Sequence, residues 1–306
     1  LQEWIMTNSM VPMNGLFSCE YFDIESVYTG DTLRIFVGKP PSFDDNKLYP
    51  AIYALDGNAS FASLTGTQRM LTQGGEVPAS FVIGIGYPGD TLWEAMARRN
   101  RDYAPSDPGE AETRALGAKE KAGGVSFLRF IQRELKPLIE KHYPIDPNNS
   151  TLQGISLGGL FGAWVLLNEP GTFNNYILGS PAIWWRNEEV WQWEETYAEN
   201  HNDLPAKVFV GAGALETEEN LRADALIIAE KNPALGDQVK HMIAWNDAQR
   251  WPEVAKLVPQ LVSHLQLRRY PGLCIHSQIF PDENHMSVMP AISSRGLRFV
   301  FDSWKP

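Results

Sequence analysis

The stretch Ser150–Gly159 constrains the fold more than any other part of the chain. An apolar, strand-like segment leads into the pattern Gly-Ile-Ser-Leu-Gly, which is centred on Ser156. In such a pattern a serine stands on a sharp turn between a strand and a helix, so its neighbours two positions away must be nearly free of side chain. The turn lifts the hydroxyl clear of the sheet and leaves the N–H of Leu157 at a helix N-terminus, which favours developing negative charge. The motif predicts a nucleophilic serine.

An ordinary glycine-rich connection between a strand and a helix is the alternative reading of these residues, but the rest of the chain favours the nucleophile. Apolar runs of strand length alternate with segments of helical spacing, as in Tyr49–Leu55 and Phe81–Gly86. The alternation predicts one α/β domain over residues 1–306, with a mostly parallel central sheet flanked by helices on both faces. We expect further strands at 17–27, 32–37, 176–180, 207–211 and 274–280. We expect helices at 59–71, 127–143 (N-capped near Ser126), 156–167, 187–199, within 218–268 and at 287–304. Residues 90–124 are predicted to form a surface loop region with helical pieces.

The formal net charge of -11 argues against a nucleic-acid partner or an anionic membrane surface, because phosphate binding needs clustered Lys and Arg. No apolar run reaches about 18 residues, so no membrane span is expected. The chain starts at Leu1 without a charged, apolar leader, which leaves the compartment of a soluble protein open: cytoplasmic, or secreted after leader removal. Cys19 and Cys274 form no Cys-x-x-Cys pair, so no zinc or redox motif is present. We expect two buried thiols, with a disulfide as the alternative.

Two further residues complete a candidate catalytic constellation with Ser156. Glu216 and His285 each follow a predicted parallel strand, and the carboxyl ends of such strands meet at one edge of a sheet. A serine hydroxyl needs a base that accepts its proton, and His285 can serve because imidazole titrates near neutrality. Glu216 would hold the other ring nitrogen. Glu218 and Glu219 are alternative carboxylates, although they also suit the first turn of a helix.

The oxyanion hole needs a second N–H beside that of Leu157. The loop Asp56-Gly57-Asn58 follows a buried strand and supplies it, with Asn58 as the expected donor and Gly57 as the alternative. Asp56 would shape the turn through Asx hydrogen bonds.

Candidate substrate contacts come from two places. Trp184 and Trp185 follow the strand next to the nucleophile strand, and we expect one of them in an acyl or aryl pocket and the other in the core. The run Arg98-Arg99-Asn100-Arg101 could recognise a substrate carboxylate, with Arg98 as the candidate. For Arg101 we favour the alternative, an ion pair with Asp102 or with surface acids.

Taken together, five motifs resemble the putative-esterase family, which includes esterase D, the enterobactin-type trilactone siderophore esterases and the mycobacterial mycolyltransferases. The trilactone branch is the most similar, because of Asp-Gly-Asn, the segment 101–105 and the Ser-Pro-x-x-Trp-Trp step. The similarity extends over roughly residues 20 to 303. The motifs are Leu55-Asp56-Gly57-Asn58, Gly154-Ile155-Ser156-Leu157-Gly158-Gly159, Ser180-Pro181-Ala182-Ile183-Trp184-Trp185, Gly213-Ala214-Leu215-Glu216 and Asn284-His285-Met286-Ser287.

The resemblance implies an α/β-hydrolase fold and hydrolysis of a small-molecule carboxylic ester without a metal or other cofactor. It implies Ser156 as nucleophile, His285 as base, Glu216 as acid, and the N–H groups of Asn58 and Leu157 as oxyanion hole. A serine carboxylesterase of the trilactone or esterase-D kind, working through an acyl-enzyme, is the first hypothesis. A feruloyl or acetyl carbohydrate esterase, or an acyltransferase, would use the same triad. The Ser, Glu, His order argues against an inactive hydrolase fold used for binding.

Overall fold

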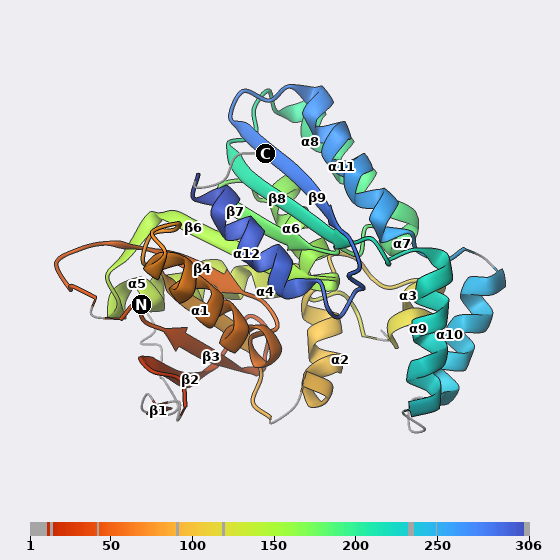
Figure 1. Ribbon diagram of the computed structural model, residues 1–306, viewed down its shortest axis with the longest axis horizontal. Coiled ribbons are helices and arrows are strands. Elements are labelled where there is room, and N and C mark those ends of the chain that lie inside the picture. Colours follow the sequence, from red (N-terminus) through yellow and green to blue (C-terminus); the bar gives the residue numbers. More distant parts are fainter. Residues whose placement is uncertain are drawn as a thin grey trace.

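A computed structural model describes residues 11–12, 15–41, 43–89, 92–117, 120–231, 236–248 and 250–302. Within these residues, nine strands form one sheet in the order β1-β2-β3-β5-β4-β6-β7-β8-β9 (Figure 1). The pairs β1–β2, β2–β3 and β3–β5 are antiparallel, and all pairs from β5–β4 through β8–β9 are parallel. The predicted mostly parallel sheet with an antiparallel entry is therefore confirmed. The strands are β1 Val11–Pro12, β2 Cys19–Glu25, β3 Thr32–Gly38, β4 Tyr49–Ala54, β5 Phe81–Gly86, β6 Ile145–Ile155, β7 Asn175–Gly179, β8 Ala206–Gly213 and β9 Leu273–Phe280.

Helices follow the predicted pattern, although several of their ends differ from the prediction. The helix expected from Phe127 begins at Gly124, and Gly123 rather than Ser126 is its N-cap. The predicted loop region at 90–124 contains two helices, α2 and α3. The helical segments are α1 Gly57–Gln73, α2 Leu92–Asp102, α3 Glu110–Leu116, α4 Gly124–Phe130, the π-helical turn η1 Ile131–Leu135, α5 Lys136–His142, α6 Leu157–Asn168, α7 Trp185–Glu188, α8 Val190–Asn200, α9 Glu218–Lys231, α10 Gly236–Ala248, α11 Val254–Arg268 and α12 Met289–Val300.

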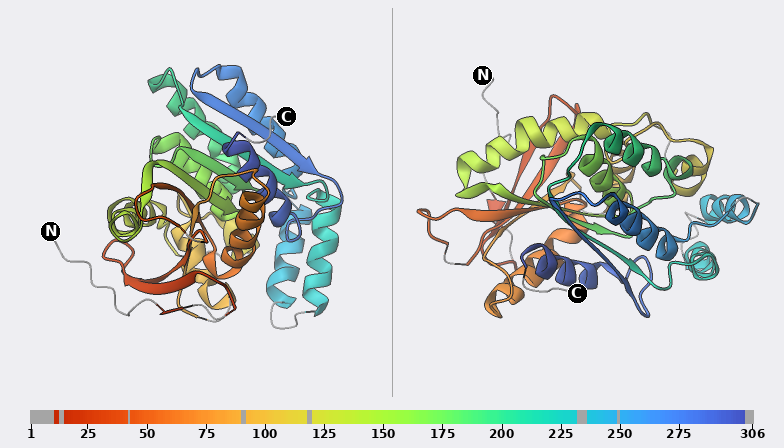
Figure 2. Two further views of the ribbon diagram at one scale, coloured as in Figure 1. Left: turned by 60° about the vertical axis from the view of Figure 1, so that its left-hand side comes forward. Right: turned by 90° about the horizontal axis from the view of Figure 1, so that it is seen from above.

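Helices cover both faces of the sheet (Figure 2). On one face, α1 and α12 pack together over a cluster that includes Phe61, Phe209 and Ile292. On the other face, α4 to α6 and α11 cover the larger cluster. All residues of α6 from Leu157 to Leu167 are buried, because this helix lies between the sheet and α8 and is apolar or small on every side. The N-terminus of α6 is thereby held rigidly at the sheet edge.

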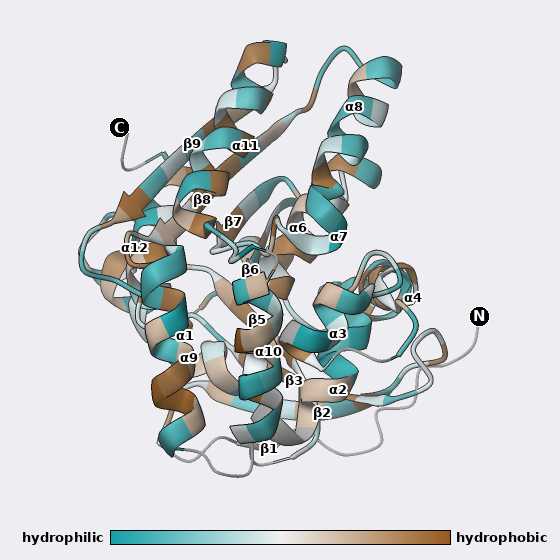
Figure 3. Ribbon diagram, turned by 90° about the vertical axis from the view of Figure 1, so that its right-hand side faces the viewer, coloured by the Kyte–Doolittle hydropathy of each residue, from teal (hydrophilic) through white to brown (hydrophobic). Residues whose placement is uncertain are grey.

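The helices α9 and α10 form a separate pair beside the sheet edge (Figures 1 and 3). Their own small core contains Ala225, Ile243 and Trp251, and α10 also contacts α3. This pair follows directly on Glu216, so it borders the place where the strands end. In the part of the chain that the structure describes, no helix has the length and apolarity that a bilayer crossing requires.

Both cysteines lie in strands and both are free thiols. Cys19 is buried in β2, as expected, but Cys274 in β9 is exposed, so the prediction of two buried thiols is wrong for Cys274. It lies on the last strand, which has no further strand to cover it. The alternative of a disulfide between Cys19 and Cys274 is also excluded, because β2 and β9 lie toward opposite ends of the strand order, with six strands between them.

Candidate active site

Ser156 stands at the sharp turn between β6 and α6 with φ 57° and ψ −120°, a conformation that is rare for a residue with a side chain. The turn is held by hydrogen bonds from the Ser156 N–H to the Gly179 carbonyl (2.8 Å) and from the Ala182 N–H to the Ser156 carbonyl (3.0 Å). A Cβ at Gly154 would lie only 2.4 Å from the Gly158 carbonyl oxygen, so this position requires glycine. The strained serine and its glycine neighbour have the geometry of a nucleophile elbow.

Glu216 and His285 are brought together by the loops that follow β8 and β9. The Nδ1 of His285 lies 2.7 Å from Oε2 of Glu216, and this carboxylate is completely buried whereas the imidazole is 30% exposed. Neither Glu218 nor Glu219 is buried. Of the carboxylates considered from the sequence, the structure therefore pairs Glu216 with the histidine.

Ser180, which the sequence interpretation did not identify as a site residue, completes the surroundings of Glu216. Its hydroxyl donates to Oε1 of Glu216 at 2.5 Å, and the Gly213 N–H donates to the same oxygen at 2.8 Å. Ser180 is fully buried and follows β7, which pairs with β8. Its place in the Ser-Pro-x-x-Trp-Trp motif was the only signal in the sequence.

Ser156 and His285 both lie at the carboxyl edge of the parallel strands. Within the described residues, the Ser156 hydroxyl makes no direct hydrogen bond to His285. Such contacts are often long in a site without substrate and shorten when substrate binds. Among the residues that the structure describes, the imidazole makes its hydrogen bond through Nδ1 and none through Nε2.

The loop after β4 forms the first turn of α1. Asp56 is the N-cap residue with a left-handed conformation (φ 55°), and the N–H groups of Ala59 and Ser60 donate to its carbonyl. Within the described chain, the N–H groups of Asn58 and Leu157 donate to no protein acceptor. Both belong to the first turn of a helix, where backbone N–H groups are left free to bind an anion.

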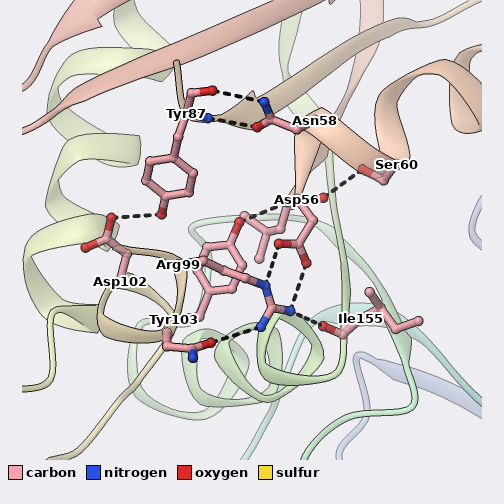
Figure 4. A network of polar contacts seen from close by, with 10 residues as sticks. Asp56, Asn58, Ser60, Tyr87, Arg99, Asp102, Tyr103 and Ile155 are labelled. Atoms are coloured by element: carbon pink, nitrogen blue, oxygen red, sulfur yellow. Dashed lines mark hydrogen bonds and ion pairs between the residues drawn. The ribbon is translucent and has the colours of Figure 1, made fainter. Parts of the chain in front are cut away.

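Side chains fix this loop in ways that the sequence interpretation missed (Figure 4). The Asn58 amide accepts from the Tyr87 N–H and donates to the Tyr87 carbonyl, both at 2.9 Å. The expected Asx turn at Asp56 is wrong, because both carboxylate oxygens bind the Arg99 guanidinium instead, at 2.6 and 3.0 Å. The backbone N–H of Asp56 donates to the Tyr103 hydroxyl.

The arginine run therefore divides into residues with different surroundings. Arg101 pairs with Asp102 (2.7 Å) and Asp31 (2.5 Å), as the favoured interpretation expected. Burial raises the pKa of the Asp102 carboxyl, although Arg101 and the Tyr87 hydroxyl act against that rise. Arg98 is half-buried with its guanidinium 5.2 Å from the Tyr87 ring centre. The prediction of a surface loop region is wrong here, because Arg99 and Asp102 are buried beneath the site.

The two tryptophans have different environments. Trp185 is fully buried, and its indole N–H donates to the Ser106 hydroxyl at 2.9 Å. Its side chain therefore lies in the core and cannot line an open pocket, so the prediction of Trp185 as a substrate contact is wrong. Trp184 is half-buried at the edge of the large core cluster and stays a predicted substrate contact.

Comparisons with known proteins agree on one family. The family profile described as "Putative esterase" matches residues 26–254. The ferri-bacillibactin esterase BesA of Bacillus subtilis is 32% identical over 280 residues, which cover 88% of this chain and 84% of the relative. A siderophore triacetylfusarinine C esterase of Aspergillus fumigatus is 26% identical over 90% of each chain.

Solved structures give the same result for the fold. The BES protein from Bacillus cereus aligns with a TM-score of 0.71 and 28% identity, covering 96% of this chain and 99% of that structure. The siderophore hydrolase EstA from Aspergillus nidulans aligns with a TM-score of 0.72 and 22% identity, covering 98% and 99% of the two chains.

Proposed function

This chain belongs to the putative-esterase family of α/β-hydrolases and is a carboxylic ester hydrolase. From this premise we propose that it cleaves the ester bonds of a siderophore. We further propose that the reaction passes through an acyl-enzyme on Ser156. The observation that carries the catalytic part is the contact of 2.7 Å between His285 Nδ1 and the buried Glu216 carboxylate. A carboxylate only accepts hydrogen bonds, so this contact keeps the proton on Nδ1 and leaves Nε2 as a base.

In the proposed acylation step, Nε2 of His285 takes the proton from the Ser156 hydroxyl while Oγ attacks the ester carbonyl carbon. The carbonyl π electrons move to oxygen, and the N–H groups of Asn58 and Leu157 stabilise that negative charge. The tetrahedral intermediate collapses as the imidazolium gives its proton to the leaving alkoxide. An acyl-Ser156 ester and a free alcohol result.

Deacylation repeats these steps with water as the nucleophile. His285 takes one proton from the water, hydroxide adds to the acyl carbon, and the proton passes to Ser156 Oγ as the acid leaves. Glu216 stays ionised and stabilises the imidazolium in both halves. The proposed mechanism needs no metal or other cofactor.

The substrate part of the proposal comes from the relatives. The bacterial relative is named as a ferri-bacillibactin esterase and the fungal relative as an esterase of the siderophore triacetylfusarinine C, and the chain covers at least 84% of each. For this chain we propose a siderophore whose building blocks are joined by ester bonds. Half-buried Trp184 and Arg98 are the proposed contacts for its aromatic and anionic groups.

Labelling with a fluorophosphonate probe tests the nucleophile. Peptide mass spectrometry is expected to find one adduct, on Ser156, and S156A is expected to lose both the adduct and at least about 1,000-fold of ester hydrolysis. S263A, at an exposed serine of α11, serves as the matched control and should label normally. An unlabelled, folded wild-type protein would refute the catalytic part.

A substrate panel followed by liquid chromatography and mass spectrometry tests the substrate. We expect ferri-bacillibactin or triacetylfusarinine C to be opened faster than a feruloyl sugar ester at equal concentration. Faster cleavage of the feruloyl sugar would reject the siderophore assignment while leaving the nucleophile intact.

A further inference from the structure

Arg99 is a buried cation beside the site, and the proposed chemistry does not use it. Its Nε and Nη2 donate to the two carboxylate oxygens of Asp56, and the two side chains are 8% and 5% exposed. Burial acts to lower the pKa of Arg99, but the charge and hydrogen bonds of Asp56 outweigh it and the pKa is raised. The pair is a two-bond ionic contact.

The same guanidinium reaches the nucleophile strand. Its Nη2 also lies 3.4 Å from the carbonyl oxygen of Ile155, the residue directly before Ser156 (Figure 4). One planar group thus contacts both turns that carry the proposed oxyanion donors. Asp56 stands two residues before Asn58, and Ile155 stands two residues before Leu157.

Asp56 depends on such contacts for its conformation. Its left-handed backbone is unfavourable for a residue with a side chain, and its side chain makes no cap hydrogen bond to α1. The Tyr103 hydroxyl accepts the Asp56 N–H at 2.9 Å, and the Arg99 guanidinium lies 5.2 Å from the Tyr103 ring centre. Arg99 therefore supports the turn both directly and through the residue that accepts its backbone N–H.

We infer that Arg99 is a positioning residue for the oxyanion hole, which sets the relative placement of the Asn58 and Leu157 N–H groups by joining the Asp56 turn to Ile155. This inference rests on the proposed function, because it takes those two N–H groups as the donors. Direct substrate binding by Arg99 is not part of it, since the guanidinium is buried and directed at Asp56, Ile155 and Asn100.

A purely structural ion pair makes a different prediction. Buried ion pairs contribute little net stability, and removing one partner destabilises the whole fold. A positioning role instead affects the transition state, since displacement of a group by about 1 Å can cost 100-fold in rate. Hydrolysis of a p-nitrophenyl ester separates the two roles, because kcat, KM and melting temperature can be measured on one preparation.

Two variants test the inference. R99K keeps a charge for Asp56 but cannot bind both turns as a planar fork. R99M removes the charge. For both we expect kcat to fall about 100-fold with KM changed less than about threefold, on folded protein judged by near-ultraviolet circular dichroism. R268M breaks a similar two-bond pair with the buried Glu194, at the C-terminus of α11 just before β9 begins, and should keep the wild-type kcat.

Three outcomes would overturn the inference. Full kcat in folded R99K would mean that charge alone suffices, and an equal fall of kcat in R268M would mean that general destabilisation is the cause. If R99M does not fold, R99K decides. Fluorophosphonate labelling of the wild-type protein separates a failure of this inference from a failure of the proposed function. If wild type forms the Ser156 adduct and R99K keeps the wild-type kcat, the inference alone is refuted. If folded wild type forms no adduct, both are refuted.

Discussion

Glu216 is surrounded by donors on both carboxylate oxygens. Oε1 accepts from the Ser180 hydroxyl and the Gly213 N–H, and Oε2 faces Nδ1 of His285. Because a carboxylate accepts and does not donate, all three contacts are satisfied at once. An amide at this position would set its NH2 group against one of these donors. The imidazole orientation therefore depends on the charge of Glu216 as well as its shape.

We predict that E216Q lowers kcat for ester hydrolysis by about 100-fold or more, because the amide disfavours the imidazole orientation that leaves Nε2 as the base. H285A should lose still more, since the base itself is gone. Steady-state kinetics on a p-nitrophenyl ester measures both. E218Q, at an exposed glutamate nearby, is the matched control and should keep the wild-type rate.

Removal of the Ser180 hydroxyl should have a smaller effect. S180A leaves Glu216 with the Gly213 N–H and His285 as partners, and the loss of one hydrogen bond to a charged group corresponds to roughly tenfold in kcat. A rate in S180A as low as that of E216Q would mean that Ser180 contributes more than orientation. Wild-type rates in both variants would remove Glu216 from the site.

Residue positions along the chain predicted part of this site and not the rest. Ser156, Glu216 and His285 could be named because each follows a strand, and their roles stay predictions. The pair of Asp56 and Arg99 could not be predicted, because the two residues lie on different elements and meet only through tertiary packing. A motif reports the local turn, whereas a buried ion pair depends on how elements pack.

Among the elements, the long helix over α4, η1 and α5 shows what periodicity misses. The apolar spacing predicted one amphipathic helix, but the backbone widens into a π turn from Ile131 to Leu135, where the Lys136 N–H donates to the Ile131 carbonyl. Pro137 follows directly, and a proline neither donates an N–H nor leaves room for the carbonyl four residues earlier. The wider turn accommodates it. Periodicity records the apolar face and not this local change.

Glu134 belongs to this turn and accepts the Val27 N–H at 3.0 Å through Oε1. Its buried Oε2 has no hydrogen-bond partner among the described residues. Burial raises the pKa of the Glu134 carboxyl. The folded protein therefore binds this proton more readily than the unfolded chain, so the carboxyl contributes stability at low pH that is lost as the pH rises through the folded pKa.

E134Q should remove that loss. We predict that the free energy of unfolding of E134Q, relative to wild type, increases as the pH is raised from about 4 to 7. Urea denaturation at several pH values measures it, with E140Q at an exposed position of α5 as control. Parallel curves for wild type and E134Q would contradict the prediction.

Across the whole molecule, strand order explains why the site residues meet. The parallel strands β4 and β6 to β9 all end at one edge, which brings Asp56, Ser156, Ser180, Glu216 and His285 to the same side. β5 and β6 lie on opposite sides of β4, and such a reversal of strand order is where open α/β sheets bind ligands. Alternating apolar runs and helices predicted the parallel sheet. They could not predict the strand order or the separate α9–α10 pair, because both depend on contacts between distant segments.

The same strand order determines the behaviour of the two thiols. Cys19 in β2 is 5% exposed, its thiol donates to the Phe17 carbonyl, and burial raises its pKa, so thiolate is scarce and shielded. Cys274 lies in β9, at the other end of the sheet, and is exposed.

We predict that Ellman's reagent titrates one thiol rapidly in native protein and two in denaturant without reductant. C274S should abolish the rapid reaction and C19A should preserve it. Absence of free thiol in denaturant would instead require a disulfide, and with it a sheet that brings β2 and β9 together.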